Sequence, residues 1–170
     1  FNSMANVDMT VLFENFGMMG WKSGNRYTYA EGSPVTNLFM NLKYLIARDN
    51  IYMNTYDLTE VYGVGNVKLL QNNHYLPMGF MTNSALASWQ VDENEDQFNP
   101  FDKQNEFFKL ATGIKDDVYT PLDVVSQGHT DYNQFPVNKT GYGRYSFSCT
   151  DTTVTPHVKW NYEAPKDGLY

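Results

Sequence analysis

The spacing of hydrophobic residues changes along this chain of 170 residues, and no other feature constrains its fold as strongly. Several stretches before Gly113 carry apolar residues at helical intervals, whereas beyond Tyr119 apolar and polar residues alternate. Helical spacing buries one stripe of a helix, and alternation buries one face of a strand. We therefore predict an α+β fold with a mixed or mostly antiparallel sheet, a few packed helices and a β-rich C-terminal part.

Capping residues mark the starts of the predicted helices. Asn6 precedes a helix over residues 7–18, and Ser33-Pro34 and Asn99-Pro100 each combine a capping side chain with proline at the first helical position. The last of these helices is expected to run to residue 112 and to be closed by Gly113. The apolar faces are expected at Val35, Leu38, Phe39 and Leu42 in the second helix and at Phe101, Phe108 and Ala111 in the third.

Several segments are predicted to be strands. Residues 43–48 form an apolar run bounded by polar residues, which is typical of a strand buried on both faces. Residues 66–71 follow a glycine-rich turn at 61–65, and residues 76–81 follow Asn72-Asn73, which favours a hairpin. In the alternating region, residues 145–150 and 156–162 are predicted to pair with each other around Asp151 and Thr152.

We expect these elements to form one domain over residues 1–170, since 170 residues can bury a core of their own. The Pro34 and Pro100 helices are expected to pack on one sheet that contains residues 43–48, 66–71 and the hairpin of 142–162. The chain starts at Phe1 rather than at Met, and residues 167–170 read as a turn that opens another strand. We therefore expect a piece of a larger protein.

The charge balance argues against one class of partner. Lys and Arg number 12 against 19 Asp and Glu, which gives a net charge of -7. The chain as a whole lacks the positive field that nucleic acids and anionic lipid surfaces attract, so we expect no nucleic-acid partner. Apolar runs such as 44–47 are far shorter than the roughly 18 residues that cross a bilayer, and we expect this chain to be soluble.

Two segments resemble ion-binding motifs without completing them. Residues 92–96 place oxygen ligands at the first positions of a calcium loop, but Gln97 stands where that loop needs Gly and Lys103 where it needs Glu. A solvated acidic loop is the preferred interpretation, and an irregular calcium site remains the alternative. Gly63-Val64-Gly65 lacks the third glycine and the following helix of a phosphate-binding turn.

No catalytic constellation stands out. The serines lack a nucleophile-elbow pattern, no pair of carboxylates is marked by its surroundings, and the histidines lack the spacing of a helical metal pair. Cys149 is interpreted as core filling, and the triplet Asn138-Lys139-Thr140 receives no function. We assign no catalytic residue, no metal ligand and no cofactor. The histidines are His74, His129 and His157.

Aromatic and amide side chains give the chain a chemistry suited to sugars. It contains 13 Tyr and 11 Phe; aromatic faces pack on sugar C–H groups, and planar amides bind hydroxyls. The candidate ligand-binding residues are Tyr75, Trp89, Asn99, Gln104 and Asn105. In the alternative interpretation, the aromatic rings fill the core, while the amides cap helices or hold a neighbouring loop.

Three stretches carry a family resemblance. Residues 33–39 with 42–46 are similar to a short helix followed by a "KY" strand, and residues 66–72 with 75–81 to an "N..LP.GF" segment. Residues 99–105 with 110–113 are similar to an "NPF..QN" helix. In this order, and with the ending at 160–170, they resemble the large extracytoplasmic region of the YfhO family of bacterial polytopic membrane proteins. Departures are Leu70, where that family often has an aromatic residue, and the acidic segment 92–97.

The resemblance implies a parent with many transmembrane helices in the bacterial plasma membrane and this domain on the extracytoplasmic side. It also implies sugar transfer from a polyprenyl-phosphate donor onto envelope polymers such as teichoic acids, with a catalytic acid near the membrane helices.

We expect no catalysis by this chain alone. The expected partners are its own transmembrane region and a polyprenyl-phosphate sugar or envelope glycopolymer. The alternative is a carbohydrate-binding or structural module without a catalytic parent. The charge of -7 argues against tight binding of a polyanionic acceptor.

Overall fold

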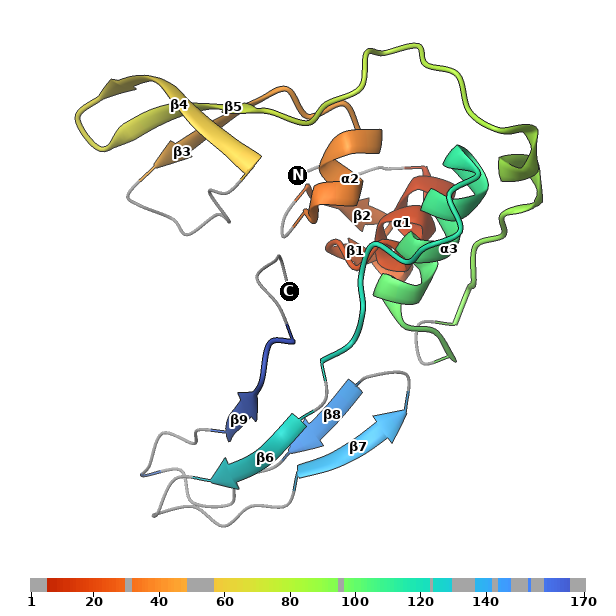
Figure 1. Ribbon diagram of the computed structural model, residues 1–170, viewed down its shortest axis with the longest axis vertical. Helices are drawn as coiled ribbons and strands as arrows, with labels where there is room; N and C mark the ends of the chain where they lie inside the picture. Colours follow the sequence, from red (N-terminus) through yellow and green to blue (C-terminus); the bar gives the residue numbers. More distant parts are fainter. Residues whose placement is uncertain are drawn as a thin grey trace.

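The computed structural model describes residues 6–29, 32–48, 57–94, 97–122, 124–129, 137–141, 144–147, 153 and 158–165 (Figure 1). Its helices are α1 (Val7–Asn15), α2 (Pro34–Phe39) and α3 (Pro100–Thr112), with short 3₁₀ turns η1 (Lys22–Gly24) and η3 (Ser84–Ser88). Its strands are β1 (Gly20–Trp21), β2 (Arg26–Tyr27), β3 (Tyr44–Arg48), β4 (Leu58–Val64), β5 (Val67–Asn72), β6 (Val124–His129), β7 (Val137–Gly141), β8 (Arg144–Phe147) and β9 (Val158–Tyr162). The described strand pairs are all antiparallel, so the predicted α+β class is confirmed.

Capping sets the bounds of α1. The side chain of Asn6 accepts a hydrogen bond from the Asp8 amide at 2.8 Å, as the N-cap prediction requires. The helix ends at Asn15, three residues before the predicted end, because Gly17 takes a positive φ of 69° and reverses the chain. A Cβ at Gly17 would lie 2.9 Å from Cβ of Pro100, so this turn also brings α1 against the start of α3.

The two proline-led helices are confirmed. Ser33 caps α2 by accepting the Thr36 amide, and Asn99 caps α3 by accepting the Phe101 amide at 3.0 Å. Gly113 closes α3 in the left-handed conformation. The predicted apolar face of α3 was partly wrong, because Phe101 is 53% exposed and two amides are buried instead.

The core lies between the helices. Phe13, Phe16 and Met18 form its buried centre at the end of α1. The Phe16 ring stacks on Trp89 with ring centres 5.5 Å apart and meets the edge of Phe107 from α3 at 5.1 Å. Phe39 of α2 contacts the same Phe107 ring at 4.8 Å, so aromatic packing joins all three helices.

The strands at 44–48 and 67–72 share a sheet as predicted, but the third strand of that sheet and the exposure of its faces differ from the prediction. They belong to a three-stranded sheet of order β3-β5-β4, and β4 replaces most of the predicted glycine-rich turn. The exposure of β3 alternates, so the prediction of a strand buried on both faces was wrong. Tyr44, Ile46 and Arg48 are exposed on one face of β3, and Leu45 and Ala47 are half-buried on the other. Figure 1 shows this sheet apart from the helical cluster, beyond α2.

Three predicted strand arrangements were wrong. Residues 76–81 form no strand, because Pro77 lacks an amide and Asn72 turns the chain by accepting the His74 amide at 3.0 Å. In the described C-terminal part, β8 pairs with β7 and β9 pairs with β6, so the predicted hairpin of 145–150 with 156–162 is absent. The strands also belong to separate sheets rather than to one shared sheet.

A short hairpin was missed near the N-terminus. None of the predicted strands covers this part of the chain, whereas β1 and β2 pair on either side of a turn in which Asn25 takes a positive φ of 49°. Asp151, Thr152, Cys149 and residues 167–170 lie outside the described residues.

Candidate functional site

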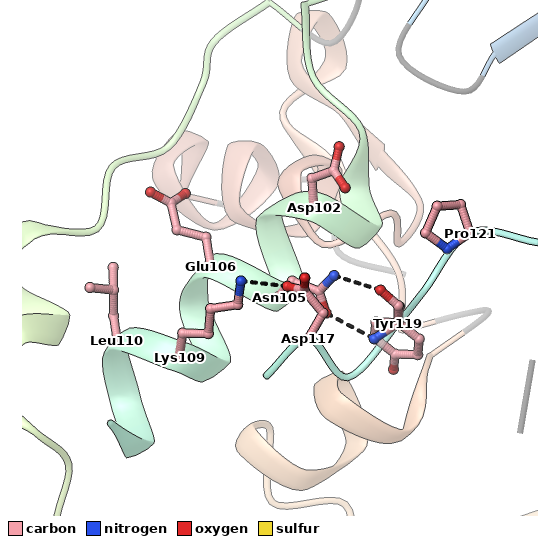
Figure 2. Close-up of a pocket in the computed structure, with 8 residues that line it drawn as sticks. All are labelled: Asp102, Asn105, Glu106, Lys109, Leu110, Asp117, Tyr119 and Pro121. Atoms are coloured by element: carbon pink, nitrogen blue, oxygen red, sulfur yellow. Dashed lines mark hydrogen bonds and ion pairs between the residues drawn. The ribbon is translucent and has the colours of Figure 1, made fainter. Parts of the chain in front are cut away.

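A cleft of about 400 Å³ lies beside α3, and both polar and apolar surface line it (Figure 2). One side is the outer surface of α3, and the other is the segment 117–121 that follows the helix. The residues that line it are Asp102, Asn105, Glu106, Lys109, Leu110, Asp117, Tyr119 and Pro121. Two segments that are close in sequence therefore form both walls.

Asn105 joins the two walls of the cleft. Its Nδ2 donates to the carbonyl of Tyr119 at 2.8 Å, and its Oδ1 accepts the amides of Val118 at 3.0 Å and Tyr119 at 2.9 Å. The residue is 7% exposed. Because these bonds occupy the amide, Asn105 holds the segment 117–121 against α3 and thereby shapes the cleft.

The rim of the cleft is acidic. Asp102, Glu106 and Asp117 supply three carboxylates, and Lys109 supplies one ammonium group, which pairs with Asp117 at 2.5 Å. Figure 2 shows Glu106 and Asp102 projecting from α3 away from that ion pair. Carboxylates accept hydrogen bonds from hydroxyl groups, so the rim suits a hydroxyl-rich or cationic ligand better than an anionic one.

Tyr119 connects the cleft to α2. Its hydroxyl accepts the amide of Val35 at 3.3 Å, and its ring meets Phe101 edge-on with ring centres 5.2 Å apart. Burial raises the pKa of the Tyr119 phenol above its ordinary value of 10.0, partly offset by hydrogen bonds with Ser33 and Val35. The phenol is therefore neutral at physiological pH.

Gln104 lies on the opposite side of α3 and is 2% exposed. Its Nε2 donates to the carbonyl of Phe16 at 2.9 Å, and its Oε1 accepts the hydroxyl of Ser33. These contacts connect the end of α1, the start of α2 and α3. Both polar atoms of Gln104 thus have protein partners, and the side chain faces the core rather than the cleft.

The other candidate residues lie in different places. Asn99 is the cap of α3, and Trp89 packs in the aromatic core with its Nε1 buried and without a hydrogen-bond partner among the described residues. Tyr75 lies in the segment after β5, where Nζ of Lys43 is 5.0 Å from its ring centre. Only Asn105 of the five lines the cleft, and ligand binding by any of them remains a prediction.

The charged residues of the cleft were missed in the sequence. Asp102, Glu106 and Lys109 follow helical spacing, which places them on one face of α3. Their shared face could therefore have been predicted from the sequence. The contribution of Asp117 depends on how the chain folds back after Gly113, which no local pattern reveals.

The acidic segment before α3 is held by protein contacts. Asp92 pairs with Lys103 at 2.5 Å, and Glu93 pairs with Lys22 at 2.7 Å, which lowers the pKa of Glu93. Asn15 binds both the amide and the carbonyl of Asp92 at 2.8 Å. Within the described part of the chain, no three His, Cys, Asp or Glu side chains gather as a metal site. Residues 95 and 96 lie outside it.

Comparison with protein families places the chain in a family of bacterial membrane proteins. The matching family is "Bacterial membrane protein YfhO", and the match covers residues 1–170, so the chain belongs to the YfhO family. No curated protein and no solved structure matches it. Among the described residues, the helices all fall short of the length and apolarity that a bilayer span requires.

Proposed function

We propose that this chain is the extracytoplasmic domain of a YfhO-type glycosyltransferase, which transfers sugar from a polyprenyl-phosphate donor onto a cell-envelope polymer. The observation that carries the proposal is the family match over residues 1–170. In this proposal the chain is one domain of a larger protein on the outer side of the bacterial plasma membrane. It binds and orients the acceptor, and the chemistry takes place elsewhere in the parent.

The cleft on α3 supports an acceptor-binding role. Asp102 and Glu106 offer carboxylate oxygens to sugar hydroxyls, while Tyr119 and Pro121 add apolar surface for sugar C–H groups. Three carboxylates against one lysine repel phosphate. The ligand that fits is therefore an uncharged sugar unit of the acceptor rather than a polyanionic stretch, which also accommodates the net charge of -7.

A second candidate function follows from the two buried amides. Gln104 and Asn105 use their polar atoms to hold α1, α2 and the segment 117–121. These contacts favour a structural role, in which the chain stabilises its own fold and binds no sugar. The two candidates differ in what they require of the exposed carboxylates of the cleft.

The test is sugar incorporation into the envelope by cells that carry the full-length protein with Asp102→Asn and Glu106→Gln. Glu93→Gln serves as the matched control, because it removes an exposed carboxylate outside the cleft. Incorporation should fall about tenfold or more with the cleft variant at normal protein abundance, since each lost hydrogen bond to a charged group is worth about 1.5–3 kcal/mol.

Unchanged sugar incorporation by the cleft variant would exclude the acceptor-binding role and favour the structural role. No incorporation defect on deletion of the whole parent would refute the glycosyltransferase itself. The purified chain should transfer no sugar from polyprenyl-phosphate donors. Transfer at a rate above that in buffer alone would contradict the proposal that catalysis takes place elsewhere in the parent.

A further inference from the structure

The solvent-exposed face of the β3-β5-β4 sheet is apolar. Residues that pair across antiparallel strands share a face, so the register defines which side chains lie together. Ile46, Leu69 and Tyr62 form the central row, with Ile46 72% and Tyr62 65% exposed. We call this the outer sheet face; its members beside the central row are Tyr44, Arg48, Thr59, Val64, Val67 and Gln71.

The opposite face of the same sheet is partly buried. Leu70 and Asn72 are buried there, and Asn72 donates from Nδ2 to the carbonyl of Leu42 at 2.8 Å. Lys68 and Glu60 form an ion pair at 2.9 Å on that face. Leu45, Ala47 and Leu58 also lie on that side, so the sheet carries aliphatic side chains on both faces. The outer sheet face exposes its own aliphatic and tyrosine side chains to solvent.

The charges of the outer sheet face are also unusual. Among its nine positions Arg48 is the one ionisable group that carries a charge at neutral pH, and no carboxylate is present. In a chain of net charge -7, the acids lie elsewhere, for example on the cleft of α3. Tyrosine on both edge strands, with aliphatic residues and an arginine beside it, is the composition that proteins place at the boundary between lipid headgroups and acyl chains.

The size of the face argues against a second copy of the chain as its partner. Three strands about 4.8 Å apart and five residues of about 3.4 Å each give a face of roughly 10 by 17 Å, or about 200 Å². A stable interface between proteins buries about 800 Å² on each partner. A face of this size suits shallow insertion into a lipid surface better than a protein interface.

We propose that the outer sheet face contacts the lipid bilayer, with its aliphatic residues inserted at headgroup depth and Arg48 at the phosphates. The chain belongs to a family of bacterial membrane proteins, so we expect it to lie close to a bilayer. The proposal needs only that membership and does not depend on sugar transfer.

The test measures co-sedimentation of the 170-residue chain with phosphatidylcholine vesicles. The wild-type chain should bind, and Ile46→Asn should weaken partitioning about tenfold, because burial of an isoleucine side chain is lost. Tyr62→Asn should act in the same direction. Ile114→Asn is the matched control, because Ile114 is likewise an exposed isoleucine, at 50%, but lies outside the face. Melting temperatures of all variants establish that each one folds.

Absence of wild-type binding at high lipid concentration would overturn the proposal, and so would equal losses with Ile46→Asn and Ile114→Asn. Sedimentation equilibrium tests the competing partner. A dimer that Ile46→Asn dissociates, without vesicle binding, would assign the face to contact between copies and also refute the lipid proposal.

Discussion

Asn105→Ala should destabilise the protein by about 2–3 kcal/mol. The substitution removes three hydrogen bonds, one to the Tyr119 carbonyl and two from the amides of Val118 and Tyr119. A typical bond is worth about 1 kcal/mol net, and a buried group left without a partner costs about 1–3 kcal/mol. Solvent reaches the exposed Val118 and compensates part of the loss, which keeps the sum near the lower end.

Urea denaturation followed by circular dichroism measures this loss as a lower midpoint with an unchanged slope. Glu106→Ala is the control, because it truncates the next residue of α3 at an exposed position and should change stability by less than about 0.5 kcal/mol. A loss below about 1 kcal/mol for Asn105→Ala would show that the segment 117–121 is not held by this amide and would refute the reasoning.

Three further predictions concern neighbouring positions. Gly113→Ala should lower the free energy of unfolding by about 1 kcal/mol in the same assay, since Gly113 has a φ of +77° and a new Cβ would lie 3.3 Å from Asn83 Nδ2. Gln104→Ala should lower it by about 2–4 kcal/mol, because the carbonyl of Phe16 loses its donor and the hydroxyl of Ser33 loses the Gln104 acceptor, and Gln104→Met should recover little of this. The raised pKa of Tyr119 contributes stability that is complete below pH 10.0 and is lost as the pH rises through that higher pKa, so Tyr119→Phe should show a smaller alkaline decline.

The elements that could be predicted from the sequence are those with local signals at both ends. α3 begins at Asn99-Pro100 and ends at Gly113, and the prediction gave its bounds correctly. The pairing of β8 with β7 and of β9 with β6 could not be predicted, because alternation identifies a strand without identifying its partner. The apolar run 43–48 was assigned two buried faces, since apolar composition does not reveal whether neighbouring structure covers both sides.

The candidate site divides in the same way. The positions of Asn99, Gln104 and Asn105 on the first turns of α3 follow from the cap, whereas their roles depend on what packs beside the helix. Gln104 and Asn105 are adjacent in sequence, so they point in directions about 100° apart on the helix. One therefore enters the core and the other borders the cleft.

This division makes α3 the element through which the core and the cleft are coupled. The inner side of the helix is fixed by Phe107 in the aromatic cluster and by Gln104, while Asp102 and Glu106 project from its outer side. A helix is nearly rigid over so few turns, so a repacked core would move the carboxylates together with the helix. The segment 117–121 would follow through the hydrogen bonds of Asn105, the ion pair of Lys109 with Asp117 and the ring contact of Phe101 with Tyr119. The width of the cleft is therefore set by these three kinds of contact, whereas its position on the molecule is set by the core.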